Sequence, residues 1–234
     1  MGKVGAVIVA AGKGSRMRSA ESKQYLQLGD KPILVHTLQL FQNITEVDEI
    51  VLVVPAADVQ RCKDLVNIYS ITKVSRVQAG GVERQDSVRL GLAALQEDTE
   101  WVLVHDGVRP FTAVEHIIGC LNQAKEAGAA VLAVPVKDTI KVVDQSKCIQ
   151  STPDRRSLWA IQTPQAFRLA LLQKAQELAI QDGFIGTDDA SLVERTGTNV
   201  LVVEGDYYNI KITTPEDLPW AEWILKHVRG ERNS

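Results

Sequence analysis

The chain has 234 residues, of which 45% are hydrophobic and 24% are charged, and its formal net charge is -3. This composition is typical of a globular protein that buries a substantial core and forms one α/β domain. Without a broad basic surplus, the chain is not expected to bind nucleic acid. It has no apolar stretch long enough to cross a bilayer, so we expect no membrane partner.

The first predicted element is a buried strand over the apolar run Val4–Val9, which leads into a turn containing Gly12 and Gly14. Two glycines permit a tight turn whose backbone amides can converge on an anion such as a nucleotide polyphosphate. Arg16 and the later Lys23 add positive charge. If a helix begins after the turn, a bound phosphate would suit both its positive end and these cations.

Two other glycine-rich turns fit this segment poorly. A dinucleotide-binding turn needs a third glycine where Met17 stands. A P-loop needs a glycine at Val7 and a hydroxyl residue at Gly14. From this segment alone, ordinary solvated surface charge stays open as the explanation of Arg16 and Lys23.

Further apolar runs alternate with helical patterns along the chain. The predicted strands are Glu49–Val54, Val74–Gln78, Trp101–His105, Ala130–Val134 and Asn199–Val203. One helix is expected to begin at Pro32, and another carries the apolar face that starts at Val114. This alternation predicts a Rossmann-like α/β fold: a mostly parallel sheet with helices on both faces. No linker or repeat interrupts it, so we expect residues 1–234 to form a single domain.

Polar clusters follow several of these strands, where ligands bind in open parallel sheets. Asp106 and Arg109 come directly after one strand, although they could also form a simple ion pair at the rim. The segment 80–87 is a glycine turn that opens a helix, and its amides could contact a base or phosphate. A simple helix cap is the alternative. His105 adjoins Asp106 and is expected at most to orient it.

The stretch Val136–Trp159 departs from this rhythm and predicts a projecting β-arm that turns at Asp144–Lys147. A strand pair of this size is only marginally stable alone, so we expect it to pack against another subunit.

The segments after the arm carry further polar residues. Gln162–Gln165 is expected to precede a helix, and Thr187–Ser191 is expected to begin one. The segment 209–213 is interpreted as an apolar strand that carries Lys211, a residue which could also protect a sheet edge.

Dispersed motifs in one order resemble the 2-C-methyl-D-erythritol 4-phosphate cytidylyltransferase family of the non-mevalonate isoprenoid pathway. The motifs are AAGKGSRM (10–17), SKQY (22–25), GGVERQDSV (80–88), VHDGVRPF (104–111), VKDTIK (136–141), DRRSLW (154–159), QTPQAF (162–167), TDDAS (187–191) and VVEGDYYNIKITTPEDL (202–218). The first is shared with other sugar nucleotidyltransferases, and the combination is far more specific. The departures are Gly107 and Val108, where the family often has two alanines, and Val82.

The resemblance implies that CMP passes from CTP to methylerythritol phosphate and that pyrophosphate leaves. The nucleotide-binding residues that it implies are Ala10, Ala11, Gly12, Gly14, Ser15, Gly80, Gly81 and Ser87. The acceptor-binding residues are Asp106, Arg109, Thr139, Arg155, Thr163, Thr187 and Lys211. Among the catalytic residues, Arg16 and Lys23 would stabilise the transition state, and Arg155 and Lys211 would aim the nucleophile.

The resemblance also implies a homodimer in which residues 136–159 reach the partner's active site. Mg²⁺ is expected to be held mainly by the CTP phosphates, with no metal ligands among the protein side chains. The three cysteines are odd in number and lack metal-ligand spacing, which favours a reducing cytoplasm.

Two alternative functions stay open from the sequence. A cytidylyltransferase for another polyol phosphate, such as ribitol 5-phosphate, could use similar loops. A non-catalytic nucleotide-binding protein could share the fold.

Overall fold

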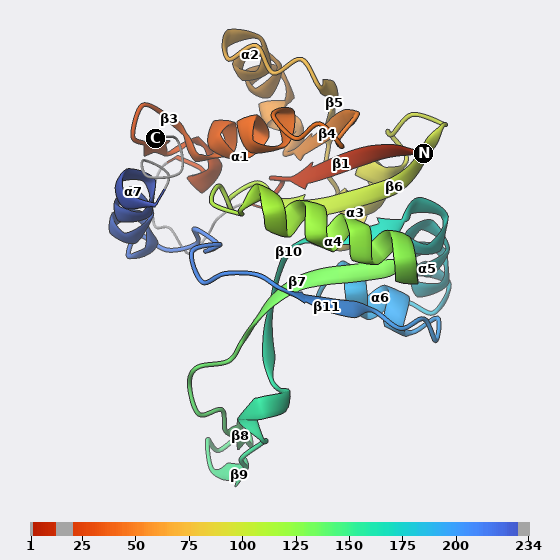
Figure 1. The fold of residues 1–234 in the computed structure, drawn as a ribbon, viewed down its shortest axis with the longest axis vertical. Helices are drawn as coiled ribbons and strands as arrows, with labels where there is room; N and C mark the ends of the chain where they lie inside the picture. The colour runs from red at the N-terminus through yellow and green to blue at the C-terminus, as the bar shows by residue number, and fades with distance from the viewer. Residues whose placement is uncertain (1, 13–20, 229–234) are drawn as a thin grey trace.

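The computed structural model describes residues 2–12 and 21–228. The elements in chain order are β1 (Lys3–Val9), η2 (Lys23–Tyr25), β2 (Gln27–Leu28), β3 (Lys31–Pro32), α1 (Ile33–Gln42), β4 (Glu49–Val54), η3 (Ala56–Asp58), α2 (Val59–Ile68), β5 (Val74–Ala79), α3 (Arg84–Leu92), β6 (Thr99–Asp106), α4 (Val114–Ala127), β7 (Ala129–Pro135), β8 (Val142–Val143), β9 (Ile149–Ser151), η4 (Arg155–Ser157), β10 (Trp159–Arg168), α5 (Leu169–Gln181), α6 (Asp189–Glu194), β11 (Leu201–Glu204) and α7 (Asp217–His227). Figure 1 shows a layered body and an arm that projects from it.

The central sheet has seven strands in the order β11-β7-β10-β6-β1-β4-β5. All neighbouring strands run parallel except β10, which is antiparallel to both β6 and β7. The prediction of a mostly parallel sheet is therefore confirmed. The sequence did not predict β10, because the polar Gln162–Gln165 lies within it and its register shifts between Ile161 and Gln165.

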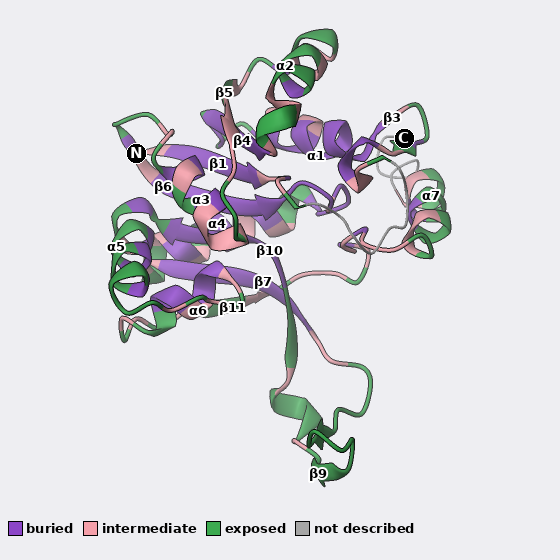
Figure 2. Ribbon diagram, turned by 180° about the vertical axis from the view of Figure 1, so that it is seen from behind, coloured by how far each residue is buried: buried purple, intermediate pink, exposed green. Residues whose placement is uncertain are grey.

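Side chains of successive strand residues enter two separate cores, as the period of two in a β-strand requires. On β6, Leu103 packs with α1 and α4 on one face of the sheet. Val102 and Val104 pack with α3, α5 and α6 on the other face. Figure 2 shows the central strands buried between these layers. Because helices cover both faces of the sheet, the sequences of its central strands are apolar at nearly every position.

Most expected boundaries lie within two residues of the observed ones, and α1 begins directly after Pro32 as predicted. The strand expected over residues 209–213 is wrong. Ile210 N donates to Tyr208 O, and Ile212 N donates to Val108 O, so no ladder forms. Instead Ile212 is buried in a third apolar cluster beneath α7. Lys211 therefore lies in a loop, and protection of a sheet edge does not explain it.

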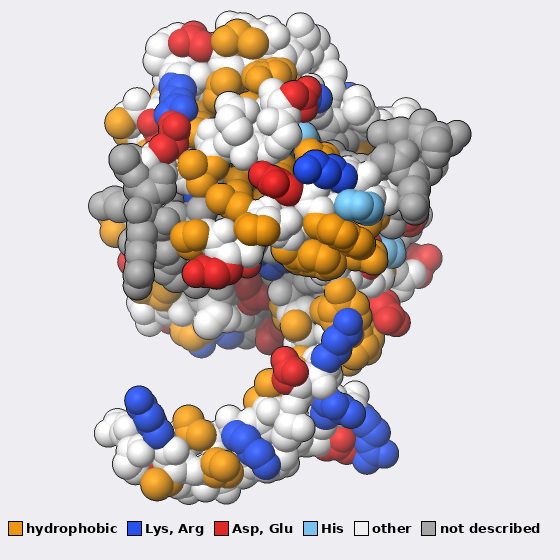
Figure 3. Space-filling model, turned by 90° about the vertical axis from the view of Figure 1, so that its left-hand side faces the viewer, with side chains coloured by type: hydrophobic (Ala, Val, Ile, Leu, Met, Phe, Trp, Pro, Cys, Tyr) orange, Lys and Arg blue, Asp and Glu red, His pale blue; other side chains and the backbone are white. Residues whose placement is uncertain are grey.

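Residues 136–158 leave the body as an arm that contains β8, β9 and η4. The Asp144 carboxylate accepts hydrogen bonds from the backbone of Ser146 and Cys148, which forms the predicted turn. At the root of the arm, the Tyr207 hydroxyl donates to Pro135 O at 2.7 Å. Figure 3 shows the arm as a separate limb carrying Lys and Arg side chains, with a hollow between its tip and the body.

Candidate active site

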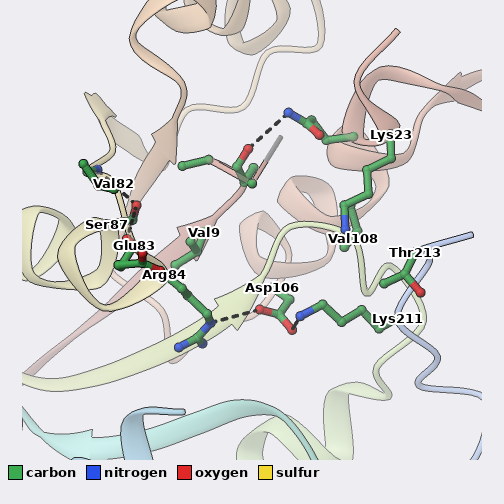
Figure 4. A pocket seen from close by; sticks show the side chains of 15 residues that line it. Val9, Lys23, Val82, Glu83, Arg84, Ser87, Asp106, Val108, Lys211 and Thr213 are labelled. Atoms are coloured by element: carbon green, nitrogen blue, oxygen red, sulfur yellow. Dashed lines mark hydrogen bonds and ion pairs between the residues drawn. The ribbon is translucent and has the colours of Figure 1, made fainter. Parts of the chain in front are cut away.

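A cavity of about 250 Å³ opens beyond the carboxyl ends of the parallel strands. It is lined by Val9, Ala10, Ala11, Gly12, Lys23, Gln24, Gly81, Val82, Glu83, Arg84, Ser87, Asp106, Val108, Lys211 and Thr213. Open α/β sheets bind their ligands at this position. Figure 4 shows that side chains from η2, α3, β6 and the loop after β11 converge on it.

The turn that follows β5 forms one wall of this cavity. Gly80 has no room for a side chain, because an added Cβ would lie 2.6 Å from Ala11 Cβ and 2.8 Å from Ser87 Oγ. The close approach brings the ends of β1 and β5 together. Gly81 N donates to Ser87 Oγ at 3.1 Å, and Glu83 and Asp86 form a capping box at the start of α3.

Lys23 faces the cavity from the opposite wall. The neighbouring Gln24 is buried, and its Nε2 donates to Ala10 O at 3.2 Å, which ties η2 to the end of β1. A buried side-chain bond of this kind fixes the backbone from which Lys23 projects. The predicted site residues Gly14, Ser15 and Arg16 lie outside the described residues.

Asp106 lies at the floor of the cavity and is surrounded by three cations. Its Oδ2 lies 2.9 Å from Lys211 Nζ and 3.4 Å from Arg109 Nε, and its Oδ1 lies 3.6 Å from Arg84 Nε. Figure 4 shows Arg84 and Lys211 approaching this carboxylate from opposite sides. Burial by itself raises the pKa of Asp106, but attraction from Arg84, Lys211 and Arg109 outweighs it. The resulting pKa lies well below the usual range, so the carboxylate is ionised.

The neighbouring His105 is fully buried on the opposite face of β6, where its ring lies 4.9 Å from that of Phe41. Burial lowers the pKa of His105 to about 4, so the ring is neutral at pH 7. Its Nε2 lies 3.0 Å from Arg109 O, a pure acceptor, so this nitrogen carries the proton. Nδ1 then accepts from the Thr163 hydroxyl, which itself accepts from Asp106 N at 3.1 Å. His105 and Thr163 thus hold Asp106 and Arg109 in place.

A second cavity of about 310 Å³ shares Arg84, Asp106 and Lys211 with the first. Its other lining residues are Arg109, Ile161, Gln162, Thr163, Gln165, Thr187 and Asp188. The structure thus places five of the predicted nucleotide residues on one side of a charged wall, namely Ala10, Ala11, Gly12, Gly81 and Ser87. The five predicted acceptor residues of the body, Asp106, Arg109, Thr163, Thr187 and Lys211, lie in this wall or on its other side.

The two acceptor residues predicted on the arm do not join this cluster within the chain. Thr139 and Arg155 are exposed, and Arg155 Nη1 donates to Lys137 O at 2.7 Å. Neither residue lines either cavity. Within one chain they therefore lie apart from the other predicted acceptor residues.

Arg84 is a site residue that the sequence reasoning missed. Besides approaching Asp106, its Nη1 donates to Oδ2 of the buried Asp189 at 2.7 Å. A signal was present, since Arg84 is the first residue of α3 and a cation there opposes the helix dipole.

Among the described residues, no group of three or more His, Cys, Asp or Glu side chains is placed to hold a metal ion. Both oxygens of Asp106 already face cations. None of the described helices is long and apolar enough to cross a membrane.

A mostly parallel sheet, with a cavity at its carboxyl edge that is lined by Lys23, Arg84 and Lys211, defines a nucleotidyltransferase-like α/β protein. Residues 4–227 match the family model described as 2-C-methyl-D-erythritol 4-phosphate cytidylyltransferase. The chain belongs to this family. A relative of that name from Geobacillus kaustophilus is 51% identical over 97% of this chain and 98% of its own length. One from Alkaliphilus metalliredigens is 49% identical over 98% and 96%.

Solved structures agree with this assignment. The 4-diphosphocytidyl-2C-methyl-D-erythritol synthase of Anaerococcus prevotii superposes with a TM-score of 0.85 at 36% identity, covering 97% of each chain. The 2-C-methyl-D-erythritol 4-phosphate cytidylyltransferase of Thermus thermophilus superposes with a TM-score of 0.79 at 32% identity. The latter match covers 96% of this chain and 99% of the other.

The neutral, buried His105 predicts a pH dependence of stability. Its pKa is about 4 when folded and about 6.5 when unfolded, so between these values only the unfolded state binds the proton. Stability is therefore lost as the pH falls from 6.5 to 4, by at most about 1.4 kcal/mol per pH unit from this group. We expect His105→Gln to flatten the pH dependence of the unfolding free energy in urea. Parallel curves for the two proteins would contradict the assignment.

Proposed function

We propose that this chain transfers the cytidylyl group of CTP to 2-C-methyl-D-erythritol 4-phosphate, yielding 4-diphosphocytidyl-2-C-methyl-D-erythritol and pyrophosphate. The observation that carries the proposal is the wall of Arg84, Asp106 and Lys211 between two cavities. Such a wall allows a nucleotide on one side and a polyol phosphate on the other to meet at their phosphates. Family membership supplies the names of the two substrates.

The chemical step joins two anions. A phosphate oxygen of the acceptor forms a bond to the α-phosphorus of CTP, and the bond from that phosphorus to the β-phosphate oxygen breaks. Negative charge grows on the oxygens of the crowded phosphorus, so positioning and fixed positive charge supply most of the catalysis. Lys23, which faces the nucleotide cavity, stabilises this charge together with Arg16.

The acceptor lies in the second cavity. The ionised Asp106 accepts hydrogen bonds from its hydroxyl groups. Lys211, Arg109, Thr163 and Thr187 hold its phosphate, and Lys211 aims the attacking oxygen toward the nucleotide cavity that it also lines. Lys211 can serve Asp106 and a phosphate together, because an ammonium group has three donors.

The nucleotide lies along the ends of β1 and β5. Ala10, Ala11, Gly12, Gly14 and Ser15 surround its ribose and phosphates, and Gly80, Gly81 and Ser87 surround the cytosine. The backbone amides of a glycine-rich turn suit phosphate oxygens. A pocket built on fixed hydrogen bonds rejects uracil by leaving polar groups unpaired.

We propose Mg²⁺ as the cofactor, bound to the triphosphate and not to protein side chains. The oxygens of the Asp106 carboxylate already face three cations, which supports a metal ion bound by the triphosphate and not by this side chain. When bound, the ion neutralises phosphate charge.

The proposed working unit is a cytoplasmic homodimer in which each chain is one domain with an arm. Ile140, Val142, Val143 and Ile149 are exposed on the arm, and apolar side chains on a marginal strand pair favour burial against a partner. The partner's Thr139 and Arg155 then complete the acceptor site. All three cysteines are free, as a reducing compartment favours.

Pyrophosphate release tests the function directly. The protein is incubated with Mg²⁺ and either CTP, UTP or ATP, and with methylerythritol phosphate or ribitol 5-phosphate as acceptor. We expect turnover only with CTP, and faster turnover with methylerythritol phosphate. Faster product formation from ribitol 5-phosphate would replace the acceptor. Equilibrium CTP binding without any pyrophosphate release would support a non-catalytic nucleotide-binding protein instead.

Removing either predicted transition-state cation provides a second test. We expect Lys23→Ala and Arg16→Ala each to lower kcat by roughly two orders of magnitude or more, because each removes charge stabilisation of the transition state. Circular dichroism checks that both variants stay folded. Lys63→Ala removes an exposed lysine from α2 outside both cavities and is expected to leave kcat unchanged. Near-normal kcat in both site variants would refute the assigned roles.

Shared active sites predict complementation between inactive variants. Mixing Arg16→Ala with Arg155→Ala creates heterodimers in which one site has both residues intact, so we expect partial recovery of activity. Native mass spectrometry confirms the subunit exchange. Exchange without any recovery would show that Arg155 does not act across the dimer.

A further inference from the structure

Asn209 is a buried polar residue that contacts both β10 and the loop after β6, two of the segments that line the second cavity. It lies 1% exposed in the loop after β11, two residues before Lys211. Its Oδ1 accepts from the Thr112 hydroxyl at 2.8 Å. Its Nδ2 donates to Gln162 Oε1 at 3.0 Å and to Thr163 O at 2.9 Å, both on β10.

The backbone of Asn209 extends the same network to a cation of the site. Its carbonyl oxygen accepts from Arg109 Nη1 at 2.7 Å, and its N–H donates to the Asp206 carboxylate at 3.0 Å. Asp206 Oδ1 also accepts from Tyr208 N, so the Asp206 carboxylate stabilises the turn formed by residues 206–209. Arg109 in turn reaches Asp106. One buried residue thus connects the loop of Lys211, the loop of Arg109 and the strand of Thr163.

The hydrogen-bonding capacity of the Asn209 amide matches its surroundings. Its two N–H groups face two carbonyl oxygens, and its oxygen faces a hydroxyl donor. An aspartate of the same shape would present an acceptor to the oxygens of Gln162 and Thr163.

We infer that Asn209 is a positioning residue for the acceptor phosphate. It fixes Lys211 and Arg109 relative to Thr163 and Asp106, although it lines neither cavity. The inference rests on the proposed function, because it assumes that these four residues bind the acceptor. The nucleotide side is held separately, through Gly80, Ser87 and Gln24. Loss of Asn209 is therefore expected to weaken binding of the acceptor much more than binding of the nucleotide.

The test compares Asn209→Asp with the wild type in steady-state assays and in direct CTP binding by calorimetry. We expect KM for methylerythritol phosphate to rise at least tenfold, while Kd for CTP changes less than twofold. A purely structural role predicts a lower melting temperature with both substrate affinities either unchanged or equally weakened. Either of those outcomes would overturn the inference.

A milder variant keeps the test decisive if Asn209→Asp does not fold. Thr112→Val conserves volume and removes only the donor to Asn209 Oδ1. We expect it to raise KM for the acceptor severalfold and to leave CTP binding unchanged. An unchanged acceptor KM in folded Thr112→Val would contradict the inference.

A double-mutant cycle identifies the route of the effect. If Asn209 acts by placing Lys211 and Arg109, its substitution costs less in kcat/KM for the acceptor when Lys211→Ala is already present. Fully additive effects would argue against this route.

The assay of the wild type distinguishes failure of the proposed function from failure of the role of Asn209. No turnover of methylerythritol phosphate by the wild type would refute the proposed function. Normal turnover by the wild type together with unaffected variants would refute only the role of Asn209.

Discussion

The site depends on one buried carboxylate that must be compensated by positive charge. Asp106 is 6% exposed, and an ionised group at such depth is tolerated only when it is paired and hydrogen-bonded. Arg84, Arg109 and Lys211 meet this requirement from α3, from the loop after β6 and from the loop after β11. The attraction between the Asp106 carboxylate and these three cations therefore holds together segments that are distant in sequence. It also keeps three cations at the edge of the sheet, where anionic substrates are expected.

The sheet explains why these groups can meet. Parallel strands end at one edge, so residues following β1, β5 and β6 share a rim whatever their separation in the chain. Because successive side chains of a strand point to opposite faces of the sheet, the adjacent residues His105 and Asp106 on β6 have different surroundings. Asp106 faces the cavities, and His105 packs on the opposite face against Phe41 while its ring nitrogens hold the rim. Core packing directly behind Asp106 thus supports the geometry of the candidate site.

Cations outnumber carboxylates among the described residues that line the two cavities. Lys23, Arg84, Arg109 and Lys211 line the two cavities, against Asp106, Asp188 and Glu83. Part of Arg84 is committed to the buried Asp189, which makes it a structural bridge between α3 and α6 as well as a member of the site. The remaining cations are partly accessible, and fixed positive charge in a confined space suits two phosphate-bearing substrates better than any neutral ligand.

The motifs that resemble the family named Asp106, Arg109, Thr163, Thr187 and Lys211, which line the second cavity. The sequence by itself also determined the fold class, six strands of the sheet to within about two residues, the turn of the arm and the charged pair Asp106 and Arg109 at the end of a strand. These follow from local patterns: buried runs, turn glycines, and charges placed after strands. Only the tertiary structure decided the antiparallel β10, the loop that carries Lys211, and the long-range contacts of Arg84 and Asn209. Their conformations depend on partners such as Asp189 and Thr163, up to about a hundred residues away in the chain. A local pattern holds no information about such contacts, because they exist only once the layers have packed.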